Sequence, residues 1–301
     1  MANYGGERGP DWQQAFLREH QLGAAYLEAA QQWFAPLAAR LAAHQKSAAR
    51  PVLYGLNGSQ GSGKTTLVDY LRQSLERDHG LRCAALSLDD FYLTRAARRT
   101  LADTVHPLFA TRGVPGTHDN ALMLRTLRRA LSPEAGELAI PRFDKARDDR
   151  CPQADWERVE LPLDVVLLEG WCLGVEAQPA ESLARPENAL ERDEDAAGIW
   201  RKHVNAVLAR DFPPVYRLVD QWIMLKAPSF DCVLRWRREQ EDKLRQRLGP
   251  GALEKTMDAA AVARFVQYYQ RLTEVALATL PSRVDYLYVL DEQRQVLREG
   301  H

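Results

Sequence analysis

Cysteine is scarce in this sequence, with four residues among 301. Cys83, Cys151, Cys172 and Cys232 are widely spaced and form no C-x-x-C pair, so neither a zinc site nor a disulfide scaffold is indicated. Because disulfides persist mainly outside the cytosol, we expect these thiols to be free in a reducing compartment.

The sequence also lacks an excess of charge of either sign. Lys and Arg total 40 and Asp and Glu total 41, which gives a formal net charge of −1 at pH 7. Broad nucleic-acid binders usually carry a basic excess, so we expect no nucleic-acid partner. The hydrophobic share of 46% is ordinary for a globular protein and excludes an intrinsically disordered chain.

Long apolar runs are absent as well. The longest, such as the run from Val165 to Leu168, are far shorter than the ~20 residues of a membrane span, so we expect no membrane partner. The N-terminal sequence MANYGGERGPDWQQ has no apolar stretch of the kind a signal peptide needs. These absences together predict a cytoplasmic globular protein, and they make no prediction of its oligomeric state.

Apolar runs and amphipathic stretches alternate along the chain in the order strand, loop, helix, strand. Val52–Leu56 predicts a strand, residues 64–79 predict a helix, and Cys83–Leu88 predicts a second strand. This order is typical of a parallel sheet flanked by helices, so the predicted fold class is α/β. Further strands are expected at 138–140, 165–168, 222–225 and 286–290. Further helices are expected at 119–131, 196–211, 229–248 and 258–279.

Three segments have a less regular pattern. Residues 11–45 carry apolar side chains at helical spacing and predict one amphipathic helix packed on the main domain. Residues 95–118 are basic and contain Gly and Pro, which predicts irregular structure. Residues 176–195 hold seven acidic residues against two arginines and predict a solvated loop, with a helix as the alternative.

One motif points directly to chemistry. The sequence Gly58-Ser59-Gln60-Gly61-Ser62-Gly63-Lys64-Thr65 matches G-x-x-x-x-G-K-[ST], between a predicted strand and a predicted helix. Its glycines let backbone N–H groups turn toward phosphate oxygens, Lys64 supplies a positive charge, and the Thr65 hydroxyl can ligate Mg²⁺. We therefore predict that Gly58 to Thr65, together with Thr66, binds a nucleotide. A glycine turn without a ligand would leave Lys64 without a purpose.

Two acidic positions follow predicted strands. Asp89 and Asp90 come directly after Cys83–Leu88, where ligands of open α/β sheets bind. Asp89 could accept the proton of an attacking hydroxyl or hold Mg²⁺ through water. The alternative is a loop pair, with one Asp capping a helix and the other in solvent.

Glu169 ends the apolar run Val165–Leu168. An acid next to a core is costly unless a cation compensates it, and Mg²⁺ at the phosphate site would do so. We predict that Thr65, Asp89 and Glu169 surround the metal. A structural acid held in a salt bridge is the alternative for Glu169.

These motifs together resemble the kinase family that contains uridine kinase, phosphoribulokinase and bacterial pantothenate kinase. Within it the sequence is most similar to D-glycerate 3-kinases of the plant photorespiratory type and their microbial relatives. The resemblance extends from about residue 50 to residue 250. Beside Gly58–Thr65, it is carried by Ser87–Thr94, Arg112–Asp119, Pro141–Lys145, Leu168–Gly174 and Val233–Arg237.

The resemblance implies a P-loop kinase domain over residues 49–301, with residues 1–48 as a helical extension. It implies phosphorylation of a small hydroxylated molecule by ATP with Mg²⁺, with Asp89 as base and Glu169 near the metal. It also implies that the helix at 229–248 is a lid that carries a catalytic arginine. Arg235, Arg237 and Arg238 are the candidates, and we assign Arg235. Alternatively, the charges of this helix form surface pairs.

The resemblance places the acceptor site in the middle of the chain. D-glycerate is an anionic small molecule, and its carboxylate needs Arg, Lys or backbone N–H groups. The predicted substrate-binding residues are Asp90, Tyr92, Arg112, His118, Arg142 and Lys145. His118 could instead cap the helix that follows it.

The leading expectation is therefore phosphorylation of D-glycerate to 3-phosphoglycerate. Pantothenate, a nucleoside or another sugar acid are alternative acceptors. The segment Phe143–Arg150 lacks the aromatic residue and the His that uridine kinase has at this place, which weakens the nucleoside alternative. A nucleotide-sensing P-loop ATPase without an acceptor is the alternative of another class.

Overall fold

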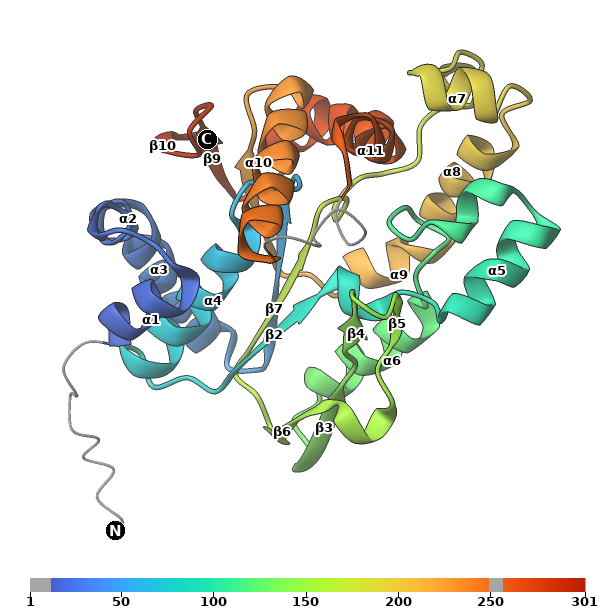
Figure 1. Ribbon diagram of the computed structural model, residues 1–301. Coiled ribbons are helices and arrows are strands. Elements are labelled where there is room, and N and C mark those ends of the chain that lie inside the picture. Colours follow the sequence, from blue (N-terminus) through green and yellow to red (C-terminus); the bar gives the residue numbers. More distant parts are fainter. Residues whose placement is uncertain (1–11, 249–256, 301) are drawn as a thin grey trace, which may run out of the picture.

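A six-stranded sheet lies at the centre of the computed structural model, which describes residues 12–248 and 257–300 (Figure 1). Its strand order is β10-β9-β8-β1-β7-β2. The strands are β1 (Val52–Gly58), β2 (Cys83–Ser87), β7 (Val165–Gly170), β8 (Gln221–Lys226), β9 (Tyr286–Leu290) and β10 (Val296–Gly300). Neighbouring strands are parallel except β9 and β10, which pair antiparallel. This sheet confirms the predicted α/β class.

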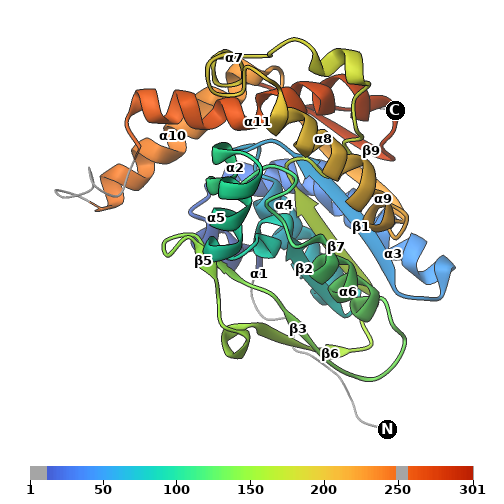
Figure 2. The same cartoon turned by 90° about the vertical axis from the view of Figure 1, so that its right-hand side faces the viewer.

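Helices cover both faces of the sheet (Figures 1 and 2). On one face lie α3 (Ala35–Ala48), α4 (Lys64–Arg77) and α10 (Phe230–Leu248), and on the other lie α6 (Asn120–Ala130), α8 (Ile199–Asp211), α9 (Pro213–Tyr216) and α11 (Ala259–Thr279). Along β7, Val165 and Leu167 pack in the apolar core on the face covered by α3, α4 and α10. Val166 and Leu168 pack in the core on the opposite face. The run is continuously apolar because the strand is buried on both faces.

The N-terminal segment is helical but is not the single helix that its spacing predicts. It forms α1 (Trp12–His20), α2 (Ala24–Ala29), a π-helical turn (Ala30–Phe34) and then α3. The chain breaks after α1 because Gln21 takes a left-handed conformation, with φ 54°. The rings of Trp12 and Phe16 then pack against Tyr70 of α4. The segment is thereby joined to the helix that follows the phosphate loop.

The prediction of irregular structure for residues 95–118 is wrong in its first half. Helix α5 (Arg95–Thr104) forms there, because the Thr94 side chain accepts a hydrogen bond from the Ala97 N–H and caps it. A 3₁₀ turn (Pro107–Ala110) follows. Two small antiparallel sheets were not predicted as pairs. They are β3 (Gly136–Ile140) with β6 (Glu157–Leu161), and β4 (Phe143–Asp144) with β5 (Asp149–Arg150).

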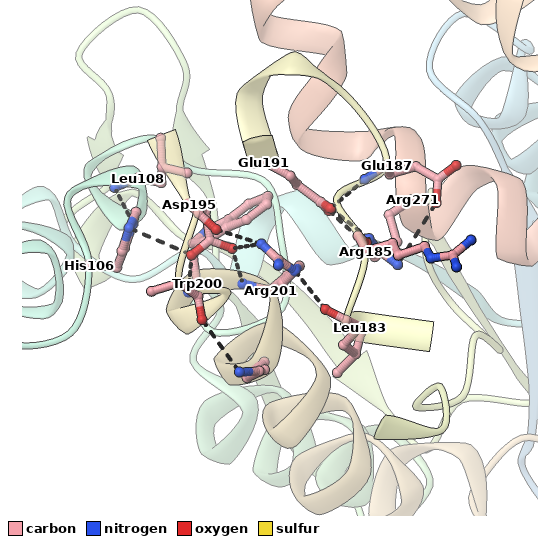
Figure 3. A network of polar contacts seen from close by, with 12 residues as sticks. His106, Leu108, Leu183, Arg185, Glu187, Glu191, Asp195, Trp200, Arg201 and Arg271 are labelled. Atoms are coloured by element: carbon pink, nitrogen blue, oxygen red, sulfur yellow. Dashed lines mark hydrogen bonds and ion pairs between the residues drawn. The ribbon is translucent and has the colours of Figure 1, made fainter. Parts of the chain in front are cut away.

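The acidic segment 176–195 is not a solvated loop. It contains a 3₁₀ turn (Ala180–Leu183) and α7 (Ala189–Glu194), and two of its acids are buried. Arg271 of α11 lies 2.6 Å from Glu191, and Arg201 of α8 lies 3.0 Å from Asp195 (Figure 3). Buried charges cost much solvation, and here each arginine also donates to backbone carbonyls. We call these four residues the buried clasp.

The structure also describes the cysteines and the apolar character of the helices. All four cysteines are free, as the sequence predicts. Within the described ranges, no helix is both long enough and apolar enough to cross a membrane.

Candidate active site

The phosphate loop connects β1 to α4, as the motif predicts. Gly61 and Gly63 have φ values of 77° and 89°, which favour glycine. A Cβ on Gly61 would lie 2.7 Å from the Cβ of Trp236 in α10, so this position has no room for a side chain. The hydroxyls of Ser59 and Ser62 are buried without a hydrogen-bond partner. Because buried polar groups are normally paired, these hydroxyls fit a loop that receives phosphate oxygens.

Glu169 lies at the end of β7 beside the phosphate loop. Its Oε1 accepts hydrogen bonds from Thr65 Oγ1 at 3.2 Å and from Ser87 Oγ at 2.9 Å. Its Oε2 has no hydrogen-bond partner and lies 4.0 Å from Lys64 Nζ. A buried carboxylate with a free oxygen next to a threonine hydroxyl fits a divalent cation.

The part of the chain that the structure describes contains no group of three or more His, Cys, Asp or Glu side chains placed to hold a metal. A cation at this site therefore has too few protein ligands for a closed cage. Mg²⁺ commonly binds through one or two carboxylates together with phosphate oxygens and water. The donors present at Thr65 and Glu169 fit that mode of binding.

Asp89 lies in a 3₁₀ turn (Leu88–Phe91) that directly follows β2. Ser87, the last residue of β2, is paired in register with Glu169, so both acids stand at the same edge of the sheet. Lys145 Nζ donates to Asp89 Oδ2 at 2.6 Å, and the Tyr92 hydroxyl donates to Oδ1 at 2.8 Å. Burial opposes ionisation, but the charges of Lys145 and Lys64 and these hydrogen bonds outweigh it and lower the pKa of Asp89 to about 2.

One cavity of about 440 Å³ connects these groups. Its floor is the phosphate loop with Glu169 and Asp89. Arg112 and Lys145 stand on one side, and Arg237 of α10 stands on another. Helices α10 and α11, which lie side by side over one end of the sheet, complete it (Figure 2). The lining residues are Gln60, Gly61, Lys64, Thr65, Ser87, Asp89, Asp90, Tyr92, Arg112, Lys145, Glu169, Trp171, Arg237, Gln240, Phe265 and Tyr269.

Comparison with known proteins agrees with this geometry. Over 262 residues the chain is 32% identical to the uncharacterized kinase mug58 of Schizosaccharomyces pombe, which covers 83% of this chain and 91% of that protein. It is 31% identical over 259 residues to the chloroplastic D-glycerate 3-kinase of Arabidopsis thaliana. The chain belongs to the glycerate 3-kinase-like family of P-loop kinases.

The match to the Arabidopsis kinase covers 81% of this chain and 53% of that protein, about half its length. No family model matches the sequence. Among solved structures, a D-glycerate 3-kinase of Cryptococcus neoformans superposes with a TM-score of 0.73 at 24% identity, over 92% of this chain and 99% of that one. This likeness shows that the two chains share a fold.

Not every residue that the glycerate 3-kinase-like pattern suggests lines the cavity. His118 is buried behind Tyr92, with the two rings stacked 4.6 Å apart. Burial lowers the pKa of His118 to about 4, so its ring is uncharged at neutral pH and supplies no positive charge to an anion. It does not cap α6 either, because Asp119 accepts the Leu122 N–H in that place.

Asp90 and Arg142 bind each other, and of the two only Asp90 lines the cavity. Arg142 Nη1 donates to Asp90 Oδ2 at 2.9 Å, and the Phe143 N–H donates to Oδ1 at 3.2 Å. Arg142 also pairs with Glu157 and lies outside the cavity lining. Asp90 borders the cavity, but its oxygens anchor the segment that leads to Lys145. Asp90 thereby fixes the Arg142 side chain and the Phe143 backbone at the border of the cavity.

Of the three candidate arginines of α10, Arg237 lines the cavity, whereas Arg235 and Arg238 do not. Arg235 is half exposed and pairs with Glu292 at 3.0 Å, outside the cavity. Arg237 lines the cavity and pairs with the buried Glu241 at 2.7 Å. Arg238 is exposed.

Several lining residues were missed by sequence reasoning. Trp171 lies in Leu168–Gly174, which carries the family resemblance, and this place in the sequence could have indicated it as a site residue. Tyr269 and Phe265 lie on α11, where apolar side chains at helical spacing only indicate a core. The Tyr269 hydroxyl donates to the Arg112 carbonyl at 3.2 Å, so this aromatic wall is joined to the cationic side of the cavity.

Proposed function

We propose that this protein is an ATP-dependent kinase that transfers the γ-phosphate to a hydroxyl of D-glycerate and gives 3-phosphoglycerate. The observation that carries the proposal is the single cavity in which Lys64, Asp89 and Glu169 face the acceptor-side cations Arg112 and Lys145. The Arabidopsis relative is a D-glycerate 3-kinase, which supports the same acceptor.

In this proposal the nucleotide phosphates occupy the phosphate loop. The backbone of the loop, the hydroxyls of Ser59 and Ser62 and the ammonium group of Lys64 hold the phosphate oxygens. Thr65 and Glu169 are the residues that would hold Mg²⁺. When bound, the metal supplies positive charge to the phosphate oxygens of ATP.

Asp89 receives the proton of the acceptor hydroxyl. Its low pKa keeps it ionised at neutral pH, so it can accept a hydrogen bond from that hydroxyl and orient it for in-line attack on the γ-phosphorus. Tyr92 holds the second carboxylate oxygen. Lys145 donates a hydrogen bond to the other oxygen, and a bound acceptor carboxylate offers Lys145 another partner.

The walls of the cavity favour a small anionic acceptor. Arg112 and Lys145 supply the charge that a carboxylate needs. The rings of Trp171 and Tyr269 limit the space beside these two cations. The ring centroids lie 4.9 Å apart, and the ring planes meet at 83°.

Measuring ADP release with a panel of acceptors tests the proposal. We expect D-glycerate to stimulate release at least about tenfold over the acceptor-free rate, because bound acceptor outcompetes water for the γ-phosphate. Pantothenate, uridine and sugar acids should leave the rate near its background. Stimulation by one of these compounds alone would identify that compound as the acceptor in place of D-glycerate. A rate of ADP release that is independent of every acceptor would indicate a nucleotide-sensing ATPase.

Replacing Arg237 by Met is expected to lower kcat about 10²-fold or more, because the guanidinium stabilises charge on the transferring phosphoryl group. Arg235→Met on the same helix is the matched control and should retain nearly full kcat. Steady-state kinetics of both purified variants gives the answer. If Arg235→Met proved the more damaging change, the assignment of the lid arginine would be reversed.

A further inference from the structure

Arg98 of α5 is a charged side chain buried outside the cavity, with 1% of its surface exposed. Its guanidinium donates hydrogen bonds to three backbone carbonyls. Nε reaches Leu93 O at 3.3 Å, Nη1 reaches Ala110 O at 2.8 Å, and Nη2 reaches Asp148 O at 2.7 Å. Because a buried cation is costly to desolvate, such complete pairing indicates that Arg98 joins these three segments.

Asp148 carries the connection from Arg98 toward the cavity. It lies in the turn between β4 and β5 with φ 56°, a left-handed conformation. Its Oδ2 lies 2.9 Å from Arg98 Nη2, while its Oδ1 accepts a hydrogen bond from Arg112 Nη1. One carboxylate thus bridges a buried arginine and a cavity arginine.

The same turn holds Lys145. Arg112 Nη2 donates to the Lys145 carbonyl at 3.5 Å, and the guanidinium carbons of Arg98 and Arg112 lie 5.9 and 5.4 Å from the centre of the Phe143 ring. The β4–β5 hairpin is therefore held in place by both arginines.

We propose that Arg98 is a positioning residue that fixes the acceptor-side cations Arg112 and Lys145 through Asp148. The inference rests on the proposed function, because it takes this side of the cavity as the acceptor site. Arg98 makes no contact with the phosphate loop, which connects β1 to α4. Its loss should therefore weaken acceptor binding and leave nucleotide binding unchanged.

The kinetic test compares Arg98→Met with Arg99→Met, a neighbouring exposed arginine on the same helix. We expect Arg98→Met to raise the KM for D-glycerate at least about tenfold, because small misplacements of binding groups are costly. The KM for ATP should change less than about twofold, and Arg98→Lys should recover part of the loss. Arg99→Met should match the unaltered protein.

A double-mutant cycle tests the route through Asp148. If Arg98 acts through it, Asp148→Asn should raise the acceptor KM similarly, and the double variant should be little worse than either single one. Fully additive effects would overturn the route. An equal rise in the KM for ATP, or an unchanged acceptor KM in Arg98→Met, would overturn the positioning role.

Hydrogen exchange gives a readout that does not require the acceptor to be D-glycerate. Amide exchange across residues 143–150 should be faster in Arg98→Met than in Arg99→Met, while exchange in β1 and β7 stays equal in both. Unchanged exchange in the hairpin would overturn the proposal. If the hairpin responds but D-glycerate does not stimulate ADP release, the acceptor assignment fails and the structural role of Arg98 stands.

Discussion

Replacing Lys64 by alanine is expected to lower kcat/KM for ATP by about 10³-fold or more while the protein stays folded. Lys64 is the cation of the cavity that lies at the phosphate loop itself. The other cations that line the cavity are Arg112, Lys145 and Arg237 of α10. Its charge acts on phosphate oxygens in a site where hydrogen bonds to ions are strong. Because it lies at the start of α4 and its ion-pair distance to Glu169 is 4.0 Å, its removal breaks no close salt bridge.

Steady-state kinetics and thermal unfolding of Lys64→Ala measure these two expectations. Lys46→Ala, at the end of α3, is the control, because it removes a lysine far from the loop in sequence and outside the cavity lining. A Lys64→Ala protein with activity within about tenfold of the unaltered one would contradict the phosphate-binding assignment.

Replacing Asp89 by alanine is expected to lower kcat about 10²- to 10⁴-fold, the range over which a positioned base contributes. The KM for ATP should change little, because Asp89 contacts Lys145 and Tyr92 and not the loop backbone. Since the pKa of Asp89 is about 2, its protonation should produce no acid limb in kcat/KM at mildly acidic pH.

Asp103→Ala, an exposed acid of α5, is the matched control for Asp89→Ala and should behave like the unaltered protein. Near-full activity of Asp89→Ala would show that another group receives the proton. An acid limb in kcat/KM that disappears in Asp89→Ala would show that the pKa of this carboxyl in the free enzyme lies well above 2.

The phosphate loop and the sheet could be predicted because their signals are local. The glycine spacing of residues 58–65 specifies a turn, and apolar runs buried on both faces specify parallel strands. The proximity of Asp89 and Glu169 could also be predicted from the sequence, because acids at the carboxyl ends of parallel strands lie at one edge of the sheet.

The lid arginine could not be chosen from the sequence. Arg235 and Arg237 are two residues apart, which places them about 200° apart around a helix. Charges are spread around α10, so its sequence does not show which side faces the cavity. Trp236, packed against Gly61, sets the rotation of the helix in the structure.

The buried acids could not be predicted for a different reason. A count of seven acids in residues 176–195 indicates solvent, and the count hides two different kinds of partner. Arg271 is 80 positions from Glu191, so that pairing depends on how α7 and α11 meet, which no local pattern encodes. Arg201 is only six positions from Asp195, but the sequence does not show that this pair is buried.

The buried clasp supports the wall of the cavity from outside, because none of its four residues lines the cavity. Arg271 anchors α11 two residues beyond Tyr269, and Asp195 also lies 3.7 Å from His106, beside the turn that precedes Arg112. Helix α10 is held at the phosphate loop instead, where Arg294 donates to the Gly61 carbonyl and pairs with Glu239. The two helices that complete the cavity are therefore fixed by separate sets of ion pairs.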